Sequence, residues 1–371
     1  MKILHFHDNI QAARRFVVPL VEAERNAGFG SDLVTSSAAP DIDIVPLHFT
    51  LNLSNIVRWP SSILRLIDTL RKHRPDVIIC HNTRSALLPL LIGKLSCVTV
   101  RVYFNHGVPA LGYRFFVKWV LTLLEKINLL LAEVVITVSN DMAEEIARIS
   151  RRSNPTVIHH GSACGIKIES YSPETREKIR RQWREKNGIP LKDSVIVYVG
   201  RPVKRKGFEL LIRSWGVVLN SRNRTLVLCG CDETDVVKFV GRMPENTLAL
   251  GYVEDIREIL FASDFLVMPS FHEGLSYAVI EAMSYGLVVI VNDIPGMGGL
   301  VTHNKSGYLI QGNDMKSYDQ TIDKLERDRN VCRIIGDQAK KESQNFSRDL
   351  FMPKYIDFLR ALEFDKVSRA Q

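Results

Sequence analysis

Residues 269–299 are PSFHEGLSYAVIEAMSYGLVVIVNDIPGMGG, a pattern typical of a turn, a short helix, a strand and a glycine-rich loop. Residues 266–268 before it and 287–291 within it are continuously apolar, as in parallel strands that helices cover on both faces. Two carboxylates belong to this stretch, Glu273 in the turn and Glu281 eight residues later in the helix. Ligands of open parallel sheets bind beyond the carboxyl ends of the strands, so we predict that the Glu273 turn faces a binding cleft.

The same alternation of strand and helix patterns extends through the rest of the chain. At 371 residues the chain is long enough for two domains of ordinary size. The strand patterns of the two halves cover residues 2–6, 32–35, 44–47, 76–80, 97–105, 134–139, 156–159, 195–199, 225–229, 247–250 and 265–268. Helical patterns lie between them, among them residues 12–26 and 112–132. The alternation predicts an α/β fold with two doubly wound domains facing each other across a cleft.

Changes in composition divide this predicted architecture into four segments. Residues 1–165 are expected to form the first domain, and the highly charged residues 166–192 a hinge and a solvated helix. Residues 193–345 are expected to form the second domain. Residues 346–371 are expected to form a C-terminal helix that crosses back to the first domain.

Composition narrows the classes of function. The chain is 46% hydrophobic and 24% charged, typical of a soluble globular protein. It contains no run of eighteen apolar residues, so we expect no transmembrane helix, and the pattern of its first residues leads us to expect no secretion signal. Its net charge of +8 suits phosphorylated ligands or an anionic membrane surface. Nucleic acid is disfavoured as a partner because no nucleic-acid-binding motif accompanies the charge. Six cysteines without metal-ligand spacing are expected to be buried thiols in a reducing cytoplasm.

A second motif whose residues are suited to ligand binding is YVGRPVKRKGF, residues 198–208. It lies between the first strand of the second domain and the next helix, and it places Arg201 and Lys206 at the strand end. Guanidinium and ammonium groups beside helix N-terminal amides are suited to phosphate binding. The motif is not a Walker A loop, because its lysine precedes the glycine. A solvated basic turn is the alternative interpretation of this motif taken alone.

Together the two motifs resemble the retaining family 4 glycosyltransferases of the GT-B fold, which has two Rossmann-like domains. The family's Gly-Arg-x4-Lys-Gly loop matches residues 200–207, and its Glu-x7-Glu motif matches Glu273 and Glu281. Shorter flanking matches are Gly251-Tyr252-Val253, Ala262-Ser263-Asp264, Glu281-Ala282-Met283 and Gly307-Tyr308-Leu309. The resemblance is dense over residues 195–312, whereas in the first half it consists mostly of topology.

The resemblance implies roles for particular residues. The residues implied to bind the donor diphosphate are Arg201, Lys206, Gly274, Leu275 and Ser276. Glu273 and His106, which ends a strand of the first domain, are implied to contact the transferred sugar as catalytic residues. Glu281 is implied to bind the donor ribose. The family needs no metal, so the resemblance implies no cofactor beyond the nucleotide sugar itself.

The implied function is retaining transfer of a sugar from a nucleotide sugar, more often a UDP-sugar, to a saccharide acceptor bound by the first domain. By analogy with the family, we expect a polyprenyl-diphosphate-linked acceptor in cell-surface polysaccharide or lipopolysaccharide synthesis. The expected location is the cytoplasm, peripherally on the inner face of the membrane. Two alternatives stay open: a non-hydrolysing nucleotide-sugar epimerase of the same architecture, and a non-catalytic subunit that binds nucleotide sugars.

Two stretches depart from the family pattern. Residues 8–13 contain none of the glycines that many family members have after the first strand. The glycine-rich loop at residues 296–299 lacks the Pro-Glu pair that often follows it. The first departure leaves acceptor handling open, and the second means that no donor contacts are carried over to this loop.

Three further features have two interpretations each. Asp41-Ile42-Asp43 matches the DxD of metal-dependent glycosyltransferases but lacks supporting context, so we interpret it as a surface turn. The helix at residues 114–132 is either core-facing or a basic amphipathic surface that rests on a membrane. His5 and His7 alternate on one face of the first strand and are interpreted as structural or cleft-lining.

Overall fold

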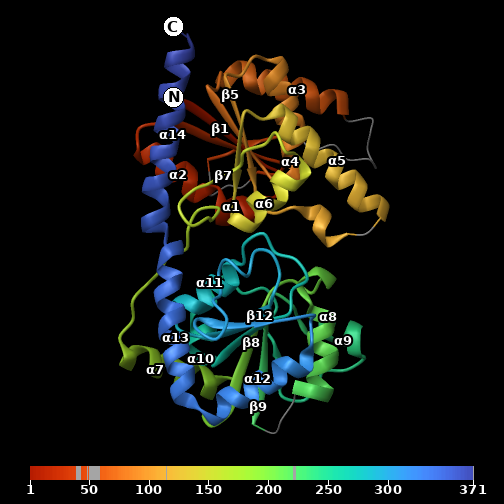
Figure 1. Cartoon of the computed structure of the whole chain (residues 1–371), viewed down its shortest axis with the longest axis vertical. Helices are drawn as coiled ribbons and strands as arrows, with labels where there is room; N and C mark the ends of the chain where they lie inside the picture. Colours follow the sequence, from red (N-terminus) through yellow and green to blue (C-terminus); the bar gives the residue numbers. More distant parts are fainter. Residues whose placement is uncertain (39–42, 48, 50–58, 114, 220–222, 371) are drawn as a thin grey trace. The chain divides into compact units, whose positions relative to one another are not determined.

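The computed structural model describes residues 1–38, 43–47, 49, 59–113, 115–219 and 223–370 (Figure 1). The chain divides into two compact units. Unit 1 comprises Met1–Gly165 together with Arg348–Gln371, and unit 2 comprises Ile166–Ser347. Each unit contains a parallel sheet between layers of helices. The predicted fold class, two doubly wound α/β domains, is confirmed.

The sheet of unit 1 has the order β3-β2-β1-β4-β5-β6-β7, and all of its pairings are parallel. Its strands are β1 (Lys2–His7), β2 (Gly30–Thr35), β3 (Val45–Pro46), β4 (Val77–His81), β5 (Val100–Asn105), β6 (Val134–Thr137) and β7 (Thr156–Val157). Every residue of the central strand β4 is buried. The ends of β1, β4 and β5 therefore lie side by side at the centre of the unit.

The helices of unit 1 are α1 (Ile10–Phe16), α2 (Val18–Asn26), α3 (Trp59–His73), α4 (Thr83–Leu95), the 3₁₀ turn η2 (Pro109–Gly112), α5 (Phe115–Leu131), α6 (Asn140–Ile149) and α14 (Arg348–Ala370). The single helix predicted for residues 12–26 is wrong, because the chain forms two helices that meet at Val17. Pro19 lies in the first turn of α2. A proline is favoured in the first turn of a helix, where its missing N–H needs no partner.

Helix α14 belongs to unit 1 although it is made of the last residues of the chain. It lies beside α2 (Figure 1). The buried Tyr355 hydroxyl of α14 donates a 2.5 Å hydrogen bond to Glu24 Oε1 of α2. Phe351, Tyr355 and Leu359 are fully buried, so one face of α14 completes the core of this unit.

The sheet of unit 2 has the order β10-β9-β8-β11-β12-β13. Its strands are β8 (Ser194–Val199), β9 (Arg224–Cys229), β10 (Thr247–Ala249), β11 (Phe265–Met268), β12 (Val288–Asn292) and β13 (Gly307–Ile310). Helical segments cover both faces: α7 (Pro173–Lys186), η3 (Lys204–Lys206), α8 (Phe208–Ser214), η4 (Trp215–Leu219), α9 (Glu233–Val240), α10 (Arg257–Ala262), α11 (Tyr277–Ser284), α12 (Met315–Arg327), α13 (Arg329–Ser343) and η5 (Gln344–Phe346). One core includes side chains of α10, α11 and α13, and the other includes side chains of α8, α9 and α12.

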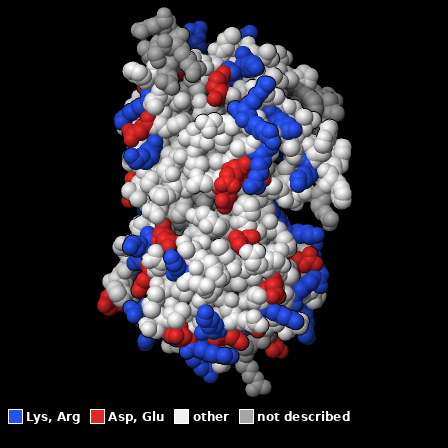
Figure 2. Space-filling view, in the orientation of Figure 1, with Lys and Arg blue, Asp and Glu red and all other residues white. Residues whose placement is uncertain are grey.

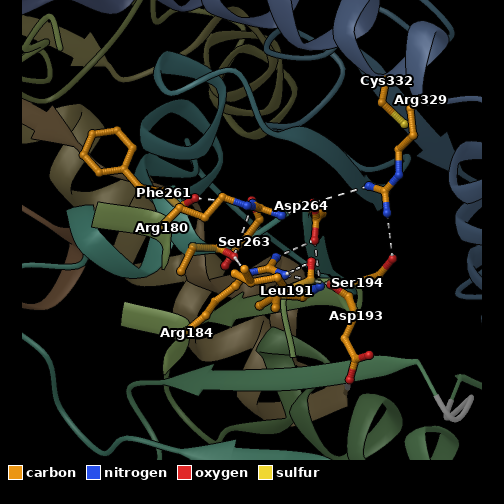
Figure 3. Close-up of polar contacts among 12 residues, drawn as sticks. Arg180, Arg184, Leu191, Asp193, Ser194, Phe261, Ser263, Asp264, Arg329 and Cys332 are labelled. Carbon is orange, nitrogen blue, oxygen red and sulfur yellow. Dashed lines mark hydrogen bonds and ion pairs between the residues drawn. The ribbon is translucent and has the colours of Figure 1, made fainter. Parts of the chain in front are cut away.

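Helix α7 is fastened to unit 2 by buried charges (Figure 3). Arg180 and Arg184 each donate a 2.8 Å hydrogen bond to the Asp264 carboxylate. Burial alone would raise the pKa of Asp264, but these two guanidinium groups outweigh it and hold the pKa below its usual value. Residues 166–192, expected as a hinge and a solvated helix, therefore contain α7 as an integral part of unit 2.

The charges on the face drawn in Figure 2 are interspersed. Lys and Arg lie among Asp and Glu, and uncharged areas separate groups of both signs. The net charge of +8 is therefore not gathered into one continuous basic surface on that face.

Candidate active site

In unit 2 the two predicted motifs meet at the carboxyl ends of adjacent strands. Lys206 follows β8 and Glu273 follows β11, and these strands are paired in the sheet. Lys206 Nζ donates a 2.6 Å hydrogen bond to Glu273 Oε1. The Ser270 hydroxyl donates to the same carboxylate oxygen at 2.8 Å. Glu273 is only 4% exposed, so its carboxylate is held by fixed partners rather than by solvent.

Gly207 allows the Lys206 loop to approach the Glu273 turn. Its φ is +69°, and a Cβ at this position would lie 1.9 Å from the backbone oxygen of Pro269. Only glycine fits such a contact, since any side chain would push the two loops apart. Gly207 therefore sets the distance between the two motifs.

Gly296 allows the glycine-rich loop to approach the Glu273 turn. Its φ is +85°, and a Cβ there would lie 2.5 Å from the Glu273 carbonyl oxygen and 2.8 Å from that of Gly274. The glycine-rich loop therefore packs directly on the backbone of this turn. The departure of residues 296–299 from the family pattern lies beyond this contact, in the residues that follow.

The turn continues into α11. Gly274 and Leu275 lead to Ser276, the N-cap residue, whose hydroxyl contacts Met268 Sδ at 3.2 Å instead of capping the helix. The N–H groups at the start of α11 are thus not covered by the Ser276 side chain. Glu281 is half-buried on α11 itself, at a different place from the Glu273 turn.

Arg201 differs from Lys206 in its surroundings. It is exposed, and its guanidinium forms no ion pair with any residue that the structure describes. Its carbonyl oxygen accepts hydrogen bonds from the Tyr198 hydroxyl at 3.1 Å and from the Val203 amide at 2.8 Å. The backbone at Arg201 is therefore fixed while its charge faces solvent.

Sequence reasoning missed several residues of this site. Arg205 lies 3.8 Å from Glu273 Oε2, and its carbonyl accepts from the Phe271 amide at 2.8 Å. Burial, with Arg205 nearby, lowers the pKa of His272 to about 4. Asn292 donates to the Ser270 carbonyl at 2.9 Å and fixes the turn from β12. Arg205 belongs to the same Lys-Arg-Lys run as Lys206, a signal that could have included it.

In unit 1, His106 directly follows β5. Its Nε2 lies 2.9 Å from Nδ1 of the buried His81. Burial, together with His7, lowers the pKa of His106 to about 3. Asn105, bonded to Glu125 at 2.8 Å, accepts from the Gly107 amide at 2.9 Å. The backbone on both sides of His106 is therefore anchored.

Helix α5, expected to be either core-facing or a surface resting on a membrane, is buried near one end and exposed at the other. Glu125, Asn128, Leu129 and Leu131 near its C-terminal end are buried. Phe115, Phe116 and Trp119 at its N-terminal end are 83%, 74% and 63% exposed. Arg114 lies outside the described residues, as do Asp41 and Ile42 of the DxD match.

Family models match both halves of the chain. The model described as Glycosyltransferase Family 4 matches residues 13–162, and the model described as Glycosyl transferases group 1 matches residues 179–342. The capsular polysaccharide biosynthesis glycosyltransferase CapM of Staphylococcus aureus is 26% identical, over 81% of this chain and 82% of that protein. The UDP-Gal:alpha-D-GlcNAc-diphosphoundecaprenol alpha-1,3-galactosyltransferase of Escherichia coli is 25% identical, over 84% and 81%.

Solved structures of similar fold span the whole chain. Anabaena Alr3699/HepE, solved in complex with UDP-glucose, superposes with a TM-score of 0.80 at 17% identity, covering 97% of this chain and 100% of that one. Sucrose-phosphate synthase from Thermosynechococcus elongatus gives 0.80 at 18% identity, covering 98% and 100%. The family 4 model matches residues of unit 1, the group 1 model matches residues of unit 2, and the two sequence relatives cover 81% and 84% of the chain. The chain is therefore a two-domain glycosyltransferase of the family 4 and group 1 type.

Proposed function

We propose that this glycosyltransferase moves a sugar, with retention and without a metal ion, from a UDP-sugar to a saccharide acceptor in cell-surface polysaccharide synthesis. The observation that carries the proposal is the contact between Lys206 and Glu273, which joins the two family motifs in one site. The relatives reported above are transferases, which favours this function over an epimerase or a non-catalytic subunit.

The donor diphosphate is assigned to the cations and amides beyond β8 and β11. Arg201 offers an exposed guanidinium, and Lys206 keeps further N–H donors besides the one directed at Glu273. The amides of Gly274, Leu275 and Ser276 add dipoles at the start of α11. Fixed cations stabilise the charge that develops on a departing diphosphate, the task that a metal ion performs in other enzymes.

The proposed retention is compatible with the places of the two carboxylates. Glu273 is held by Lys206 and Ser270, and we assign it to sugar hydroxyls rather than to nucleophilic attack. Glu281 lies within α11, away from that turn, and is assigned to the donor ribose. The proposal uses no carboxylate nucleophile of the kind found in retaining glycosidases. Instead the acceptor hydroxyl attacks on the face that the diphosphate leaves, and the diphosphate takes the proton of that hydroxyl. His106 is assigned to a hydroxyl of the transferred sugar.

The acceptor is proposed to be linked to a polyprenyl diphosphate, as the name of the Escherichia coli relative suggests for that protein. Phe115, Phe116 and Trp119 expose aromatic surface on α5, and Lys118 lies between them in the chain. Exposed aromatic and basic residues on one helix suit binding to the interface of an anionic membrane. None of the helices in the described part of the chain could span a membrane. We therefore propose peripheral attachment to the inner face of the membrane.

The test is a transfer assay with UDP-, GDP- and ADP-sugars and a lipid-linked saccharide acceptor, with and without EDTA. We expect UDP-sugar turnover that EDTA leaves unchanged and a product whose anomeric configuration, read by NMR, equals that of the donor. Inversion, or loss of turnover in EDTA that added metal restores, would contradict the mechanism. A new sugar nucleotide formed without acceptor would identify an epimerase.

A further inference from the structure

A row of buried side chains leads from Glu24 to His106 across three adjacent strands of unit 1. His5 Nε2 on β1 lies 3.0 Å from both oxygens of Glu24. His5 Nδ1 lies 2.9 Å from Nε2 of His81 on β4, and His81 Nδ1 lies 2.9 Å from Nε2 of His106 after β5. Glu24, His5 and His81 are 0% exposed, whereas His106 is half-buried. Only the last member of the row therefore reaches the surface.

The partners of Glu24 set the direction of these hydrogen bonds. The Tyr355 and Ser31 hydroxyls each donate a 2.5 Å hydrogen bond to the carboxylate. A carboxylate that accepts from two hydroxyls is also suited to accept from His5 Nε2–H, the direction that we infer for the row. With its one N–H directed at Glu24, the His5 ring accepts a hydrogen bond from His81 at Nδ1.

The same reasoning applies to the next two rings, His81 and His106. His81 donates through Nε2–H to His5, so its Nδ1 accepts from His106 Nε2–H. Burial, reinforced by the neighbouring histidines, holds the pKa of His81 well below its usual value, which keeps the ring neutral. His106 is left with a lone pair on Nδ1, and no described residue hydrogen-bonds to that atom.

The groups packed around the row do not compete for this nitrogen. His7 on β1 is near His106, with ring centroids 6.3 Å apart, but its own nitrogens face the Asn9 amide at 3.1 Å and the Asn82 side chain at 2.9 Å. Asp8 lies 3.8 Å from His7. A metal ion does not fit between rings whose nitrogens are 2.9 Å apart. The row is therefore a chain of hydrogen bonds.

We propose that Glu24, His5 and His81 are positioning residues that hold His106 in its Nε2–H tautomer, so that His106 Nδ1 accepts a hydrogen bond from a hydroxyl of the transferred sugar. This inference rests on the sugar-contacting role proposed for His106. A neutral acceptor is suited to that place, since positive charge develops on the sugar as its bond to the diphosphate breaks. The Nδ1–H tautomer would instead point a proton at the substrate hydroxyl.

The first test is direct and uses the unaltered protein without substrate. Side-chain ¹⁵N–¹H correlation spectra distinguish a protonated ring nitrogen from a bare one, and His106→Gln assigns the signals. We expect a bare Nδ1 and a protonated Nε2 on His106 between pH 6 and 8. A proton on His106 Nδ1 would overturn the inference. The spectrum needs no turnover, so it remains informative even if no UDP-sugar proves to be a donor.

The second test removes the charge that sets the direction. Glu24→Gln keeps the size of the side chain but lets the row adopt either direction, and we expect kcat to fall about tenfold with donor KM changed less than twofold. Its spectrum should show His106 Nδ1–H in part of the molecules. Glu22→Gln is the matched control, because Glu22 is exposed on the same helix, and it should leave both readouts unchanged. Loss of thermal stability with unchanged kcat and tautomer in Glu24→Gln would mean that the row is only structural.

Discussion

Lys206 Nζ lies 2.6 Å from Glu273 Oε1, so a cation from the loop after β8 and a carboxylate from the turn after β11 form one unit. Each belongs to a different family motif, 67 residues apart in the chain. The contact fixes the ammonium, so that binding the diphosphate proposed for this site would cost it little further freedom. An ordered cation of this kind is a preorganised group for stabilising charge on a leaving group.

Replacing Lys206 by Ala is expected to lower kcat by a factor of about 100 to 1,000, the usual loss when one preorganised charge is removed. Lys204→Ala is the matched control, because Lys204 lies in the same loop but is exposed. Steady-state kinetics with a UDP-sugar, alongside thermal unfolding of each variant, gives the comparison. Equal kcat in the two variants would contradict the assignment of Lys206 to the diphosphate.

Gly296→Ala is expected to lower the free energy of unfolding of unit 2 by about 2 kcal/mol, because its Cβ strains a left-handed backbone and meets the Glu273 carbonyl. The displaced turn should also reduce turnover. Gly298→Ala is the control from the same loop, since a Cβ there meets nothing within 4 Å. Urea unfolding of both variants measures the difference in unfolding free energy. Equal stability and turnover in the two would mean that the loop does not support the turn.

Asp264→Asn is expected to destabilise unit 2 at pH 7 by about 3 kcal/mol, because it removes one partner of a buried charge cluster. The folded-state pKa of Asp264 is depressed, so its ionised form contributes stability above the unfolded-state pKa. That contribution disappears as pH falls through the folded-state pKa, and the difference between wild type and variant should shrink in acid.

Urea unfolding from pH 7 down to pH 2 measures this convergence. Glu177→Gln on α7 is the control, because Glu177 is 51% exposed and pairs with Arg181 on the surface, where ion pairs contribute little. A constant difference in unfolding free energy at every pH would show that the charge of Asp264 is not the cause.

Phe116→Ser combined with Trp119→Ser is expected to weaken binding to vesicles containing anionic lipid at least tenfold, because both aromatic side chains are exposed on α5. Wild-type binding should also weaken as salt is raised. Val217→Ser, which removes an 85% exposed apolar side chain from unit 2, is the control and should bind as wild type does. Vesicle sedimentation measures all three. Vesicle binding that changes neither with salt nor with the double substitution would contradict the assignment of the membrane contact to α5.

The sequence predicted most of the sheet architecture, because buried parallel strands are continuous apolar runs. It failed at Pro19, where one helical pattern hides two helices, and at β13, whose four residues begin with Gly307. The resemblance implied that Lys206 and Glu273 belong to one donor site, but their direct contact was not predicted. The His81 and Glu24 contacts could not be predicted, since they depend on side chains from distant segments that meet only in the folded sheet. The roles of the site residues in transfer stay predictions.

The place of α14 has a consequence for the order in which the protein matures on the ribosome. Glu24 and its neighbours are synthesised early, but Tyr355, which covers the Glu24 carboxylate, follows only after all of unit 2. At about 5–20 residues per second, the 331 residues that separate Glu24 from Tyr355 take on the order of 15 to 70 seconds to synthesise. Unit 1 thus begins before unit 2 in the chain and is completed after it, so the apolar surface that α14 covers stays exposed for that interval.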